Sequence, residues 1–269
     1  CLLIVKMIFL KTEEEIEFLR ESNLLVSKTL GYVASLIKPG VTTLELDKSA
    51  ETYIRDHGGV PTFKGYPNNF GTPFPATLCT SINDQIVHGI PSGAVTLKEG
   101  DIISVDCGVR LNGFCGDSAY TFGVGEINSN VKHLLKVTKQ ALLEGIDNAV
   151  VGKRIGDIGF AIQNLCENSG YGVVREFVGH GIGRNMHEDP QVPNYGRKGY
   201  GPLLKTGMCI AIEPMITLGS RLIIMERDGW TVRTKDCSYS AHFEHTVAIT
   251  NKEADVLSTF DYIDEVLRI

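Results

Sequence analysis

The sequence predicts an α+β fold made of two similar halves that share one continuous antiparallel sheet. The order helix, helix, strands occurs twice along the 269 residues. A shift of 112 positions also places Gly40 on Gly152 and Gly58 on Gly170, which are the glycines expected to end the helices. Matching residues are few, so the repeated order of elements is the stronger indication of an internal pseudo-twofold.

Length and composition agree with a single globular unit. The 43% hydrophobic and 22% charged residues are ordinary for a soluble protein, and 269 residues can bury a large core. No run approaches the roughly 18 apolar residues of a membrane span, and the net charge of -6 argues against a dedicated DNA or membrane binder. We expect one domain over 1–269, with halves of about 12–125 and 126–250.

Cysteine usage points to a reducing compartment. The seven cysteines form no C-x-x-C pair, and several stand in apolar runs, as Cys209 does. This pattern favours buried thiols over a disulfide framework. The apolar start lacks a basic region and a cleavage site, so we expect no signal peptide and a cytoplasmic protein. Met7 is a candidate initiator, with residues 1–6 left from an upstream start.

Two capping boxes open the helices of the first half. Thr12 with Glu15 begins a helix that stops at Lys38-Pro39-Gly40, and Thr42 with Glu45 begins the second. A strand-rich and turn-rich region follows from 60 to 122.

The second half repeats this plan. Helices are predicted over about 129–149 and from about 155 to 170, separated by Gly152. Alternating apolar residues then predict strands over 173–178, 208–216, 221–225 and 242–249.

A hairpin predicted over 102–122 is the centre of the functional interpretation. Asn112-Gly113 between two alternating runs indicates a two-residue type I′ turn, because both turn residues need positive φ. This register puts Asp106 and Asp117 on one sheet face as diagonal neighbours, about 7–8 Å apart. Like charges there repel, and a cation between them is the usual remedy. Two solvated strand carboxylates are the alternative.

Three further candidates stand in the second half. His180 lies among glycines, whereas Glu213 and Glu244 lie in apolar strands, where a charge is costly unless it is paired or binds metal. Taken singly, each fits an ordinary salt bridge or a strand end in solvent. Together with the two aspartates they carry four negative charges, which suits two divalent cations sharing a hydroxide. Oxygen ligands with one imidazole suit manganese, iron or cobalt, and zinc stays open.

The chain resembles the methionine aminopeptidases, in their short bacterial type I form without an N-terminal zinc-finger extension. The resemblance covers about 12–249 and rests on these motifs: Asp106, Gly116-Asp117, Gly179-His180-Gly181-Ile182-Gly183, Ile212-Glu213-Pro214 and Phe243-Glu244-His245. It implies the pita-bread fold of creatinases and aminopeptidases, with a curved sheet shared by two pseudo-symmetric halves. It also implies five metal ligands, namely Asp106, Asp117, His180, Glu213 and Glu244.

The function implied by this resemblance is removal of the initiator methionine from nascent proteins and peptides with a small second residue. Hydroxide from a dinuclear centre of cobalt, manganese, iron or zinc would attack the carbonyl. Glu213 would carry the proton. His187 would polarise the carbonyl and steady the oxyanion, and His88 would contact the scissile amide nitrogen.

The resemblance further implies an apolar pocket for the methionine side chain, formed by Phe63, Tyr66, Cys79, Met186 and Trp230. Plain core packing is the alternative for these residues. The segment Pro67–Pro73 is longer than the family's usual link, which leaves the role of Phe74 open. Asn83 and Ser240 match positions that hold a monovalent cation in relatives.

The other histidines, His57, His133, His242 and His245, are interpreted as helix-end, surface or supporting groups. The expected substrate is the N-terminus of a peptide or nascent protein. We expect the enzyme itself to be a monomer that associates transiently with the ribosome. Three rivals share the fold: a peptidase acting on X-Pro bonds, a metal-free amidinohydrolase and a binding protein. The first normally carries an added N-terminal domain, and the other two would not need all five ligands.

Overall fold

The computed structural model describes residues 7–68 and 71–268, so the expectations for 1–6, Cys1 included, lie outside the described residues, as do positions 69–70. The four predicted helices are confirmed within two residues at either end. The helices are α1 (Glu13–Leu36), α2 (Thr43–Asp56), α3 (Ser129–Asp147), α4 (Ile155–Asn168) and a fifth that the sequence did not predict, α5 (Asp261–Leu267). Both capping boxes form, with Thr12 and Thr42 each accepting the backbone N–H three residues ahead.

The internal repeat is confirmed in the backbone. Helices α2 and α4 each contain 14 residues, and the 112-residue shift brings the bounds of one onto the other. Gly40 and Gly152 precede them with φ of 94° and 91°, and Gly58 and Gly170 follow them with φ of 78° and 83°. Only glycine adopts such angles without strain, so the same turns recur at the same places in both halves.

The strands form four antiparallel sheets. The first contains β1 (Val60–Pro61), β2 (Leu78–Ile82), β4 (Ile102–Leu111) and β5 (Phe114–Gly123). The second orders β13 (Ser240–His242), β10 (Met215–Thr217) and β6 (Gly172–Val173), and the third orders β11 (Ile223–Met225), β12 (Val232–Thr234) and β3 (Gln85–Val87). The fourth orders β15 (Asp255–Val256), β14 (His245–Ala248), β9 (Cys209–Ile212), β7 (Gly179–Gly181) and β8 (Glu188–Val192).

The predicted α+β class is confirmed, but the ladder is less continuous than expected. The strands predicted over 208–216 and 242–249 are each broken in two, and those predicted over 173–178 and 221–225 shorten to β6 and β11. Hydrogen bonds outside the ladders join the strands near the breaks. The N–H of Glu244 donates to the carbonyl oxygen of Ala119 on β5 at 2.9 Å, which joins the first sheet to the segment between β13 and β14.

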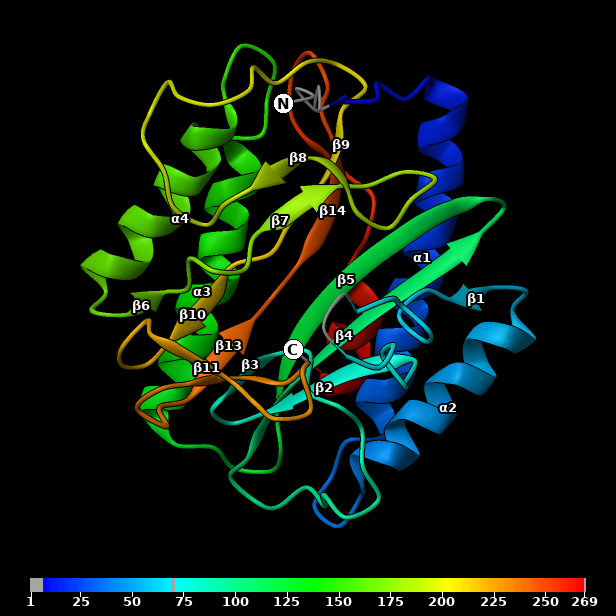
Figure 1. The fold of residues 1–269 in the computed structure, drawn as a ribbon, viewed down its shortest axis with the longest axis vertical. Coiled ribbons are helices and arrows are strands. Elements are labelled where there is room, and N and C mark those ends of the chain that lie inside the picture. Colours follow the sequence, from blue (N-terminus) through cyan, green and yellow to red (C-terminus); the bar gives the residue numbers. More distant parts are fainter. Residues whose placement is uncertain (1–6, 69–70, 269) are drawn as a thin grey trace.

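The helices flank the strands as two groups. Figure 1 shows α1 and α2 at the right of the view and α3 and α4 at the left, with the long β4–β5 hairpin crossing α1, against which it packs. Leu30 and Ile54 from the first half and Ile162 and Ile210 from the second belong to the same buried hydrophobic cluster. This shared core supports our proposal that the halves form one domain.

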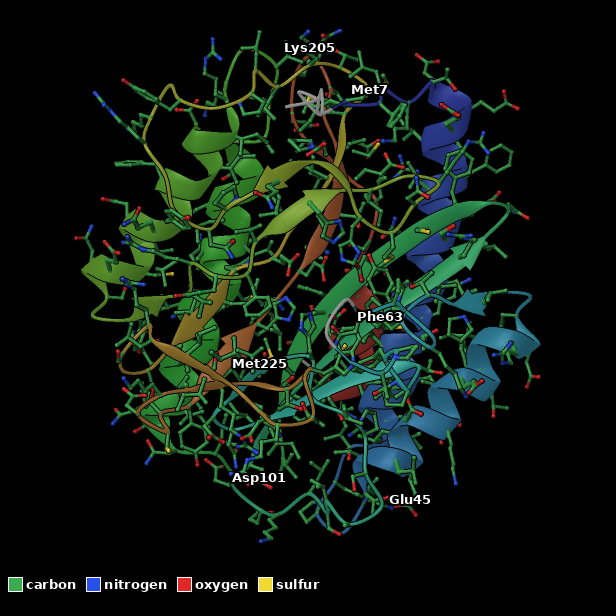
Figure 2. The ribbon with its side chains drawn as sticks, viewed as in Figure 1. Met7, Glu45, Phe63, Asp101, Lys205 and Met225 are labelled. Atoms are coloured by element: carbon green, nitrogen blue, oxygen red, sulfur yellow. The ribbon has the colours of Figure 1, made fainter. Side chains whose placement is uncertain are left out.

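Apolar side chains are mostly buried between the helices and strands, and charged side chains are mostly exposed. Phe63, labelled in Figure 2, is only 8% exposed, whereas Met7, at the rim of the view, is 61% exposed. Five of the six cysteines in the described ranges are buried, as their apolar surroundings in the sequence predicted. None of the helices described here has the length and apolar character needed to cross a membrane.

Candidate active site and metal centre

The β4–β5 hairpin presents two carboxylates as predicted. Asn112 and Gly113 form the turn with φ of 51° and 84°, and Leu111 pairs with Phe114. Asp106 faces Ala119 and Asp117 faces Gly108, so both aspartates lie on one face of the hairpin. Both also line the same pocket.

The other two carboxylates stand at the two breaks in the strand ladder. Glu213 lies between β9 and β10, and Glu244 lies between β13 and β14. The β9–β14 and β10–β13 pairs share one register across these breaks, so Glu213 and Glu244 stand opposite each other. Pro214 has no N–H to give to the ladder, which accounts for the interruption beside Glu213.

Two glycines fix the position of His180. A Cβ at Gly179 would lie 2.3 Å from the carbonyl oxygen of Ala211, and one at Gly181 would lie 2.3 Å from that of Asp189. Strand β7 therefore fits between its neighbours only because these residues are glycines. The Nδ1 of His180 is 2.9 Å from the carbonyl oxygen of Gly181, the geometry of an N–H donor.

That bond leaves Nε2 of His180 for a ligand. Nε2 lies 3.5 Å from Oδ2 of Asp117 and 3.8 Å from Oε1 of Glu213. One ligand atom from each of Asp117, His180 and Glu244 lies within 4.8 Å of the other two. The imidazole and the carboxylates thus converge on one small volume.

Burial makes this cluster electrostatically costly by itself. Desolvation raises the pKa of Asp106 to about 7 and that of Glu213 to about 8. Desolvation, followed by the neighbouring carboxylates, raises the pKa of Asp117 and Glu244 well above the usual range. Acidic oxygens crowded in this way are typical of metal sites.

The donor set fits a divalent metal. Oδ1 of Asp106, Oδ1 of Asp117 and Oε1 of Glu244 are buried without a hydrogen-bond partner. Buried carboxylate oxygens without partners are rare in folded proteins, and a hard or borderline cation is the natural partner for such oxygens and one imidazole.

Comparison with known proteins identifies the family. The profile of metallopeptidase family M24 matches residues 17–251. A methionine aminopeptidase of Clostridium acetobutylicum is 50% identical over 252 residues, which is 94% of this chain and 99% of that protein. The chain belongs to the methionine aminopeptidases of family M24.

Solved structures agree with this family. The crystal structure of methionine aminopeptidase from Rickettsia prowazekii has a TM-score of 0.91 at 40% identity, covering 94% of this chain and all of that one. The prolidase from Pyrococcus furiosus has a TM-score of 0.71 at 22% identity, covering 93% of this chain and 65% of that one, so it shares the fold alone. The pita-bread fold is therefore confirmed, and the metallopeptidase family implies divalent metal ions at the cluster.

The five proposed metal ligands of this family member line one pocket together with apolar side chains. Phe63, Tyr66, Cys79 and Trp230 line it together with all five proposed ligands. Phe74, whose role the sequence left open, also lines it and packs edge-on against Trp230 with 5.1 Å between ring centroids.

The long segment after Tyr66 contacts this wall. The indole Nε1 of Trp230 donates to the carbonyl oxygen of Thr72 at 2.9 Å, and the side-chain amide of Asn68 donates to the carbonyl oxygen of Gly229 at 3.1 Å. The described ends of the 67–73 segment therefore support the Trp230 side of the pocket.

Both proposed substrate-contacting histidines lie at this pocket. The ring of His187 is 4.3 Å from that of His180, and its Nδ1 is 2.6 Å from the hydroxyl oxygen of Tyr66. His88 packs edge-on against Phe177, with 5.3 Å between ring centroids, and has a φ of 59°. A residue other than glycine with such a φ stores backbone strain, which is a frequent feature of functional sites.

Three predicted residues, Met186, Asn83 and Ser240, are not among the side chains that line the pocket. Met186 does not line it and is buried in a cluster with Phe63 and Cys79 behind its wall. Asn83 and Ser240 are adjacent, because the N–H of Ser240 donates to the carbonyl oxygen of Asn83 at 2.8 Å. Their cation-binding role stays a prediction.

Sequence reasoning missed some residues at the site. His242 is buried, and its Nε2 is 3.5 Å from Oε2 of Glu213. Its position two residues before Glu244 in an extended segment could have indicated the same face. The pocket is also lined by Val87, Phe177, Val178 and Met215, for which the sequence offered no indication.

The remaining histidines agree with the sequence interpretation. His57 caps the end of α2, and His133 is an exposed partner of the Tyr171 hydroxyl. His245 is buried, and its Nδ1 is 2.7 Å from the hydroxyl oxygen of Ser258. None of the three lines the pocket.

Proposed function

We propose that this chain removes the N-terminal methionine from peptides and nascent proteins whose second residue is small, using a dinuclear metal centre. One observation carries the proposal: four carboxylates, two of them buried and two half-buried, line an apolar pocket together with one imidazole, in a chain that belongs to the methionine aminopeptidases. An apolar pocket that contains a charged cluster suits a substrate with an apolar side chain beside a charged amino group.

Two divalent cations are proposed because one would leave most of the four negative charges uncompensated. Asp106, Asp117, His180, Glu213 and Glu244 would hold them, and cobalt, manganese, iron and zinc all fit this donor set. When bound, such a pair supplies an attacking water of lowered pKa and Lewis acidity toward the peptide carbonyl.

The chain's own residues do the remaining work. Glu213 accepts the proton of the attacking water and passes it to the leaving amine. The imidazole of His187 donates a hydrogen bond to the carbonyl oxygen, on which negative charge develops. His88 orients the scissile amide from the opposite wall, where Phe177 and Trp230 hold its ring.

Specificity for methionine follows from the pocket walls. Aromatic faces and the Cys79 thiol surround a soft thioether favourably, and burial keeps that thiol protonated because desolvation raises its pKa. The charged cluster in the pocket holds the free amino group, which leaves no path for residues upstream of methionine. This geometry favours an exopeptidase.

The test is hydrolysis of Met-Ala-Ser, Met-Leu-Ser and X-Pro peptides by metal-stripped protein, with manganese, iron, cobalt or zinc added back singly. We expect methionine release only with metal, and faster release from Met-Ala-Ser than from Met-Leu-Ser. Preferred cleavage of X-Pro bonds would replace this function by that of a prolidase. Absence of release with every metal, by folded protein, would refute the peptidase function.

The cellular location, the oligomeric state and the ribosome association are proposed from the family. We propose that the chain acts as a cytoplasmic monomer on N-termini emerging from the ribosome, with transient ribosome association. We also propose that carbonyl oxygens at Asn83 and Ser240 hold a monovalent cation. Sedimentation of the purified protein with and without ribosomes tests the first proposal.

A further inference from the structure

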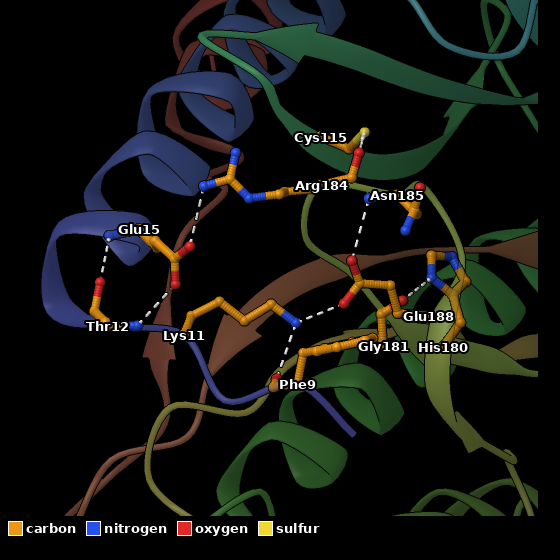
Figure 3. A network of polar contacts seen from close by, with 10 residues as sticks. All are labelled: Phe9, Lys11, Thr12, Glu15, Cys115, His180, Gly181, Arg184, Asn185 and Glu188. Atoms are coloured by element: carbon orange, nitrogen blue, oxygen red, sulfur yellow. Dashed lines mark hydrogen bonds and ion pairs between the residues drawn. The ribbon is translucent and has the colours of Figure 1, made fainter. Parts of the chain in front are cut away.

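The segment before α1 reaches the active-site region through one side chain. In Figure 3, Lys11 extends from this segment toward Glu188, the first residue of β8. Its Nζ donates to Oε2 of Glu188 at 2.7 Å and to the carbonyl oxygen of Phe9 at 3.1 Å. Both charged side chains are only 6% exposed, which makes this a buried ion pair.

The segment itself is held in place by the backbone. The N–H of Lys11 donates to the carbonyl oxygen of Gly207 at 2.7 Å, two residues before β9 begins. Lys11 is therefore fixed at its backbone and at its ammonium. Few rotamers remain for it to lose when the ion pair forms.

Glu188 in turn closes the loop formed by residues 182–187, which joins β7 to β8. Its Oε1 accepts the N–H of Asn185 at 3.1 Å, and the N–H of Gly183 donates to the carbonyl oxygen of Asn185 at 3.1 Å. The loop carries His187, which directly precedes Glu188 in the chain. Any displacement of the Glu188 carboxylate therefore moves the backbone next to His187.

A glycine of the second-half motif is explained by this pair. A Cβ at Gly183 would lie 2.6 Å from Cε of Lys11 and 2.7 Å from Oε1 of Glu188. Gly183 is not among the glycines with positive φ, so backbone conformation does not require a glycine there. A larger residue there would displace the Lys11 ammonium or the Glu188 carboxylate from their present positions.

We propose that Lys11 and Glu188 are positioning residues, whose buried ion pair fixes the 182–187 loop so that His187 faces the metal-ligand cluster. The proposal rests on the function proposed above, because it acts through His187. A buried charge that loses its partner must move toward water or draw water in, and either change displaces the loop. Displacement of a substrate-contacting group by about 1 Å can cost about 100-fold in rate.

The variants separate the charge from the packing. Lys11→Met keeps an aliphatic stem, Glu188→Gln keeps an acceptor for Asn185, and Lys11→Arg keeps the positive charge. Arg184→Met is the matched control. Arg184 also joins this loop to α1, through Glu15 at 3.2 Å, but its side chain is 66% exposed. Exposed pairs of this kind contribute little.

Kinetics of Met-Ala-Ser cleavage give the first readout. With metal-loaded enzyme well below its Tm, Lys11→Met and Glu188→Gln should lose about 10- to 100-fold in kcat with a smaller change in KM. Lys11→Arg should recover most of the rate, and Arg184→Met should match the wild type. Metal affinity by calorimetry should be unchanged. In a His187→Ala background, Lys11→Met should add no further loss.

A second readout does not depend on activity. In zinc-loaded, ¹⁵N-histidine-labelled protein, Lys11→Met should shift the imidazole signal of His187 and leave that of His57 unchanged. Two results would overturn the positioning role. One is an unchanged His187 signal in Lys11→Met. The other is a loss of kcat from Lys11→Met that is as large in the His187→Ala background as in the wild type. Wild-type enzyme without methionine release would refute the proposed function, while the imidazole signal would still decide whether the pair positions the loop.

Discussion

The two halves of the molecule supply carboxylates to the same cluster by different means. In the first half, Asp106 and Asp117 belong to an unbroken hairpin in which all ten residues of β4 pair with residues of β5. In the second half, Glu213 and Glu244 stand at breaks between short strands. A regular ladder thus presents one pair of ligands, and an interruption presents the other.

This difference determines what holds each ligand in place. The continuous ladder places both hairpin aspartates, and Asp117 is held in addition because its N–H donates to Oδ1 of Asn23 at 3.1 Å and its carbonyl oxygen accepts the Thr246 hydroxyl at 2.9 Å. The glutamates need partners from elsewhere, because the amide of Asn194 donates to the carbonyl oxygen of Glu213 at 2.9 Å and the hydroxyl of Ser118 donates to that of Glu244 at 2.7 Å. We therefore expect substitutions near the hairpin to affect stability and substitutions near the breaks to affect site geometry as well.

The largest expected effect is that of Asp106→Asn. The substitution removes a ligand while both strands still pair, so cleavage of Met-Ala-Ser should fall by about 1,000-fold or more, in line with the several kcal/mol supplied by metal catalysis. Without metal, it also relieves repulsion among buried carboxylates, so the Tm of the stripped protein should rise by about 2–4 °C. Peptide assays, calorimetry with metal and thermal unfolding measure the three effects.

Asp56→Asn, at the exposed end of α2, is the matched control and should change none of these quantities. Glu244→Gln extends the comparison to a ligand at a break. It should lose activity equally and raise the Tm of the stripped protein by a similar amount, because the contacts of Glu244 with β5 are made by its backbone and are kept in the variant. If Asp106→Asn kept the wild-type activity, the proposed metal mechanism would be refuted.

Thr121→Val tests the link between the halves. The Thr121 hydroxyl donates to the carbonyl oxygen of His242 at 2.7 Å, accepts the N–H of His242 at 2.9 Å and contacts the Ser104 hydroxyl at 2.8 Å. Valine has the same shape but leaves these buried groups unpaired, so unfolding in urea should show a loss of about 2–3 kcal/mol. Thr121→Ser keeps the hydroxyl and should cost much less. Equal losses would show that packing, and not hydrogen bonding, joins the sheets.

The contrast between the unbroken hairpin and the broken strands also explains how well the sequence predicted each region. The Asn112-Gly113 turn, the capping boxes at Thr12 and Thr42 and the repeated glycines are local features, so their conformations depend on nearby residues alone. They predicted the hairpin register, the helix bounds and the shared face of Asp106 and Asp117. The placement of His180 opposite these aspartates depends on packing between distant strands, and only the family motifs indicated it.

The errors have the same origin. The strands predicted over 208–216 and 242–249 have unbroken apolar periodicity, and nothing in that periodicity shows where the ladder stops. The break at Glu213 follows from Pro214, and the break at Glu244 is the same interruption seen on the opposite strand, where the N–H of Glu244 bonds to Ala119 on β5. His242 was assigned no definite place because its burial comes from contacts across the two halves.

Tyr66→Phe tests the hydrogen bond between Tyr66 of the first half and His187 of the second half. The Tyr66 hydroxyl, 2.6 Å from Nδ1 of His187, holds the imidazole so that Nε2 is left for the substrate. Desolvation raises the pKa of this phenol, so the hydroxyl keeps its proton and is able to donate to Nδ1. Phenylalanine keeps the apolar wall and loses the bond, so kcat should fall about 10-fold with little change in KM, equivalent to about 1.4 kcal/mol.

Tyr53→Phe, on α2, is the control and should match the wild type. A rise in KM alone for Tyr66→Phe would show that the tyrosine acts as a wall of the methionine pocket and does not orient His187.

Gly113→Ala has the smallest expected effect and tests the hairpin directly. Gly113 has a φ of 84°, and an added Cβ would approach only Nη1 of Arg184, at 3.9 Å, so the cost is conformational and amounts to about 1 kcal/mol. Urea unfolding should show this loss, while kcat of the folded enzyme stays unchanged because the ten-residue ladder keeps Asp106 and Asp117 in register. Gly199→Ala, at a φ of 73° in an open loop of the other half, should cost the same. A fall in kcat for Gly113→Ala alone would mean that the turn, and not the ladder, sets the spacing of the two aspartates.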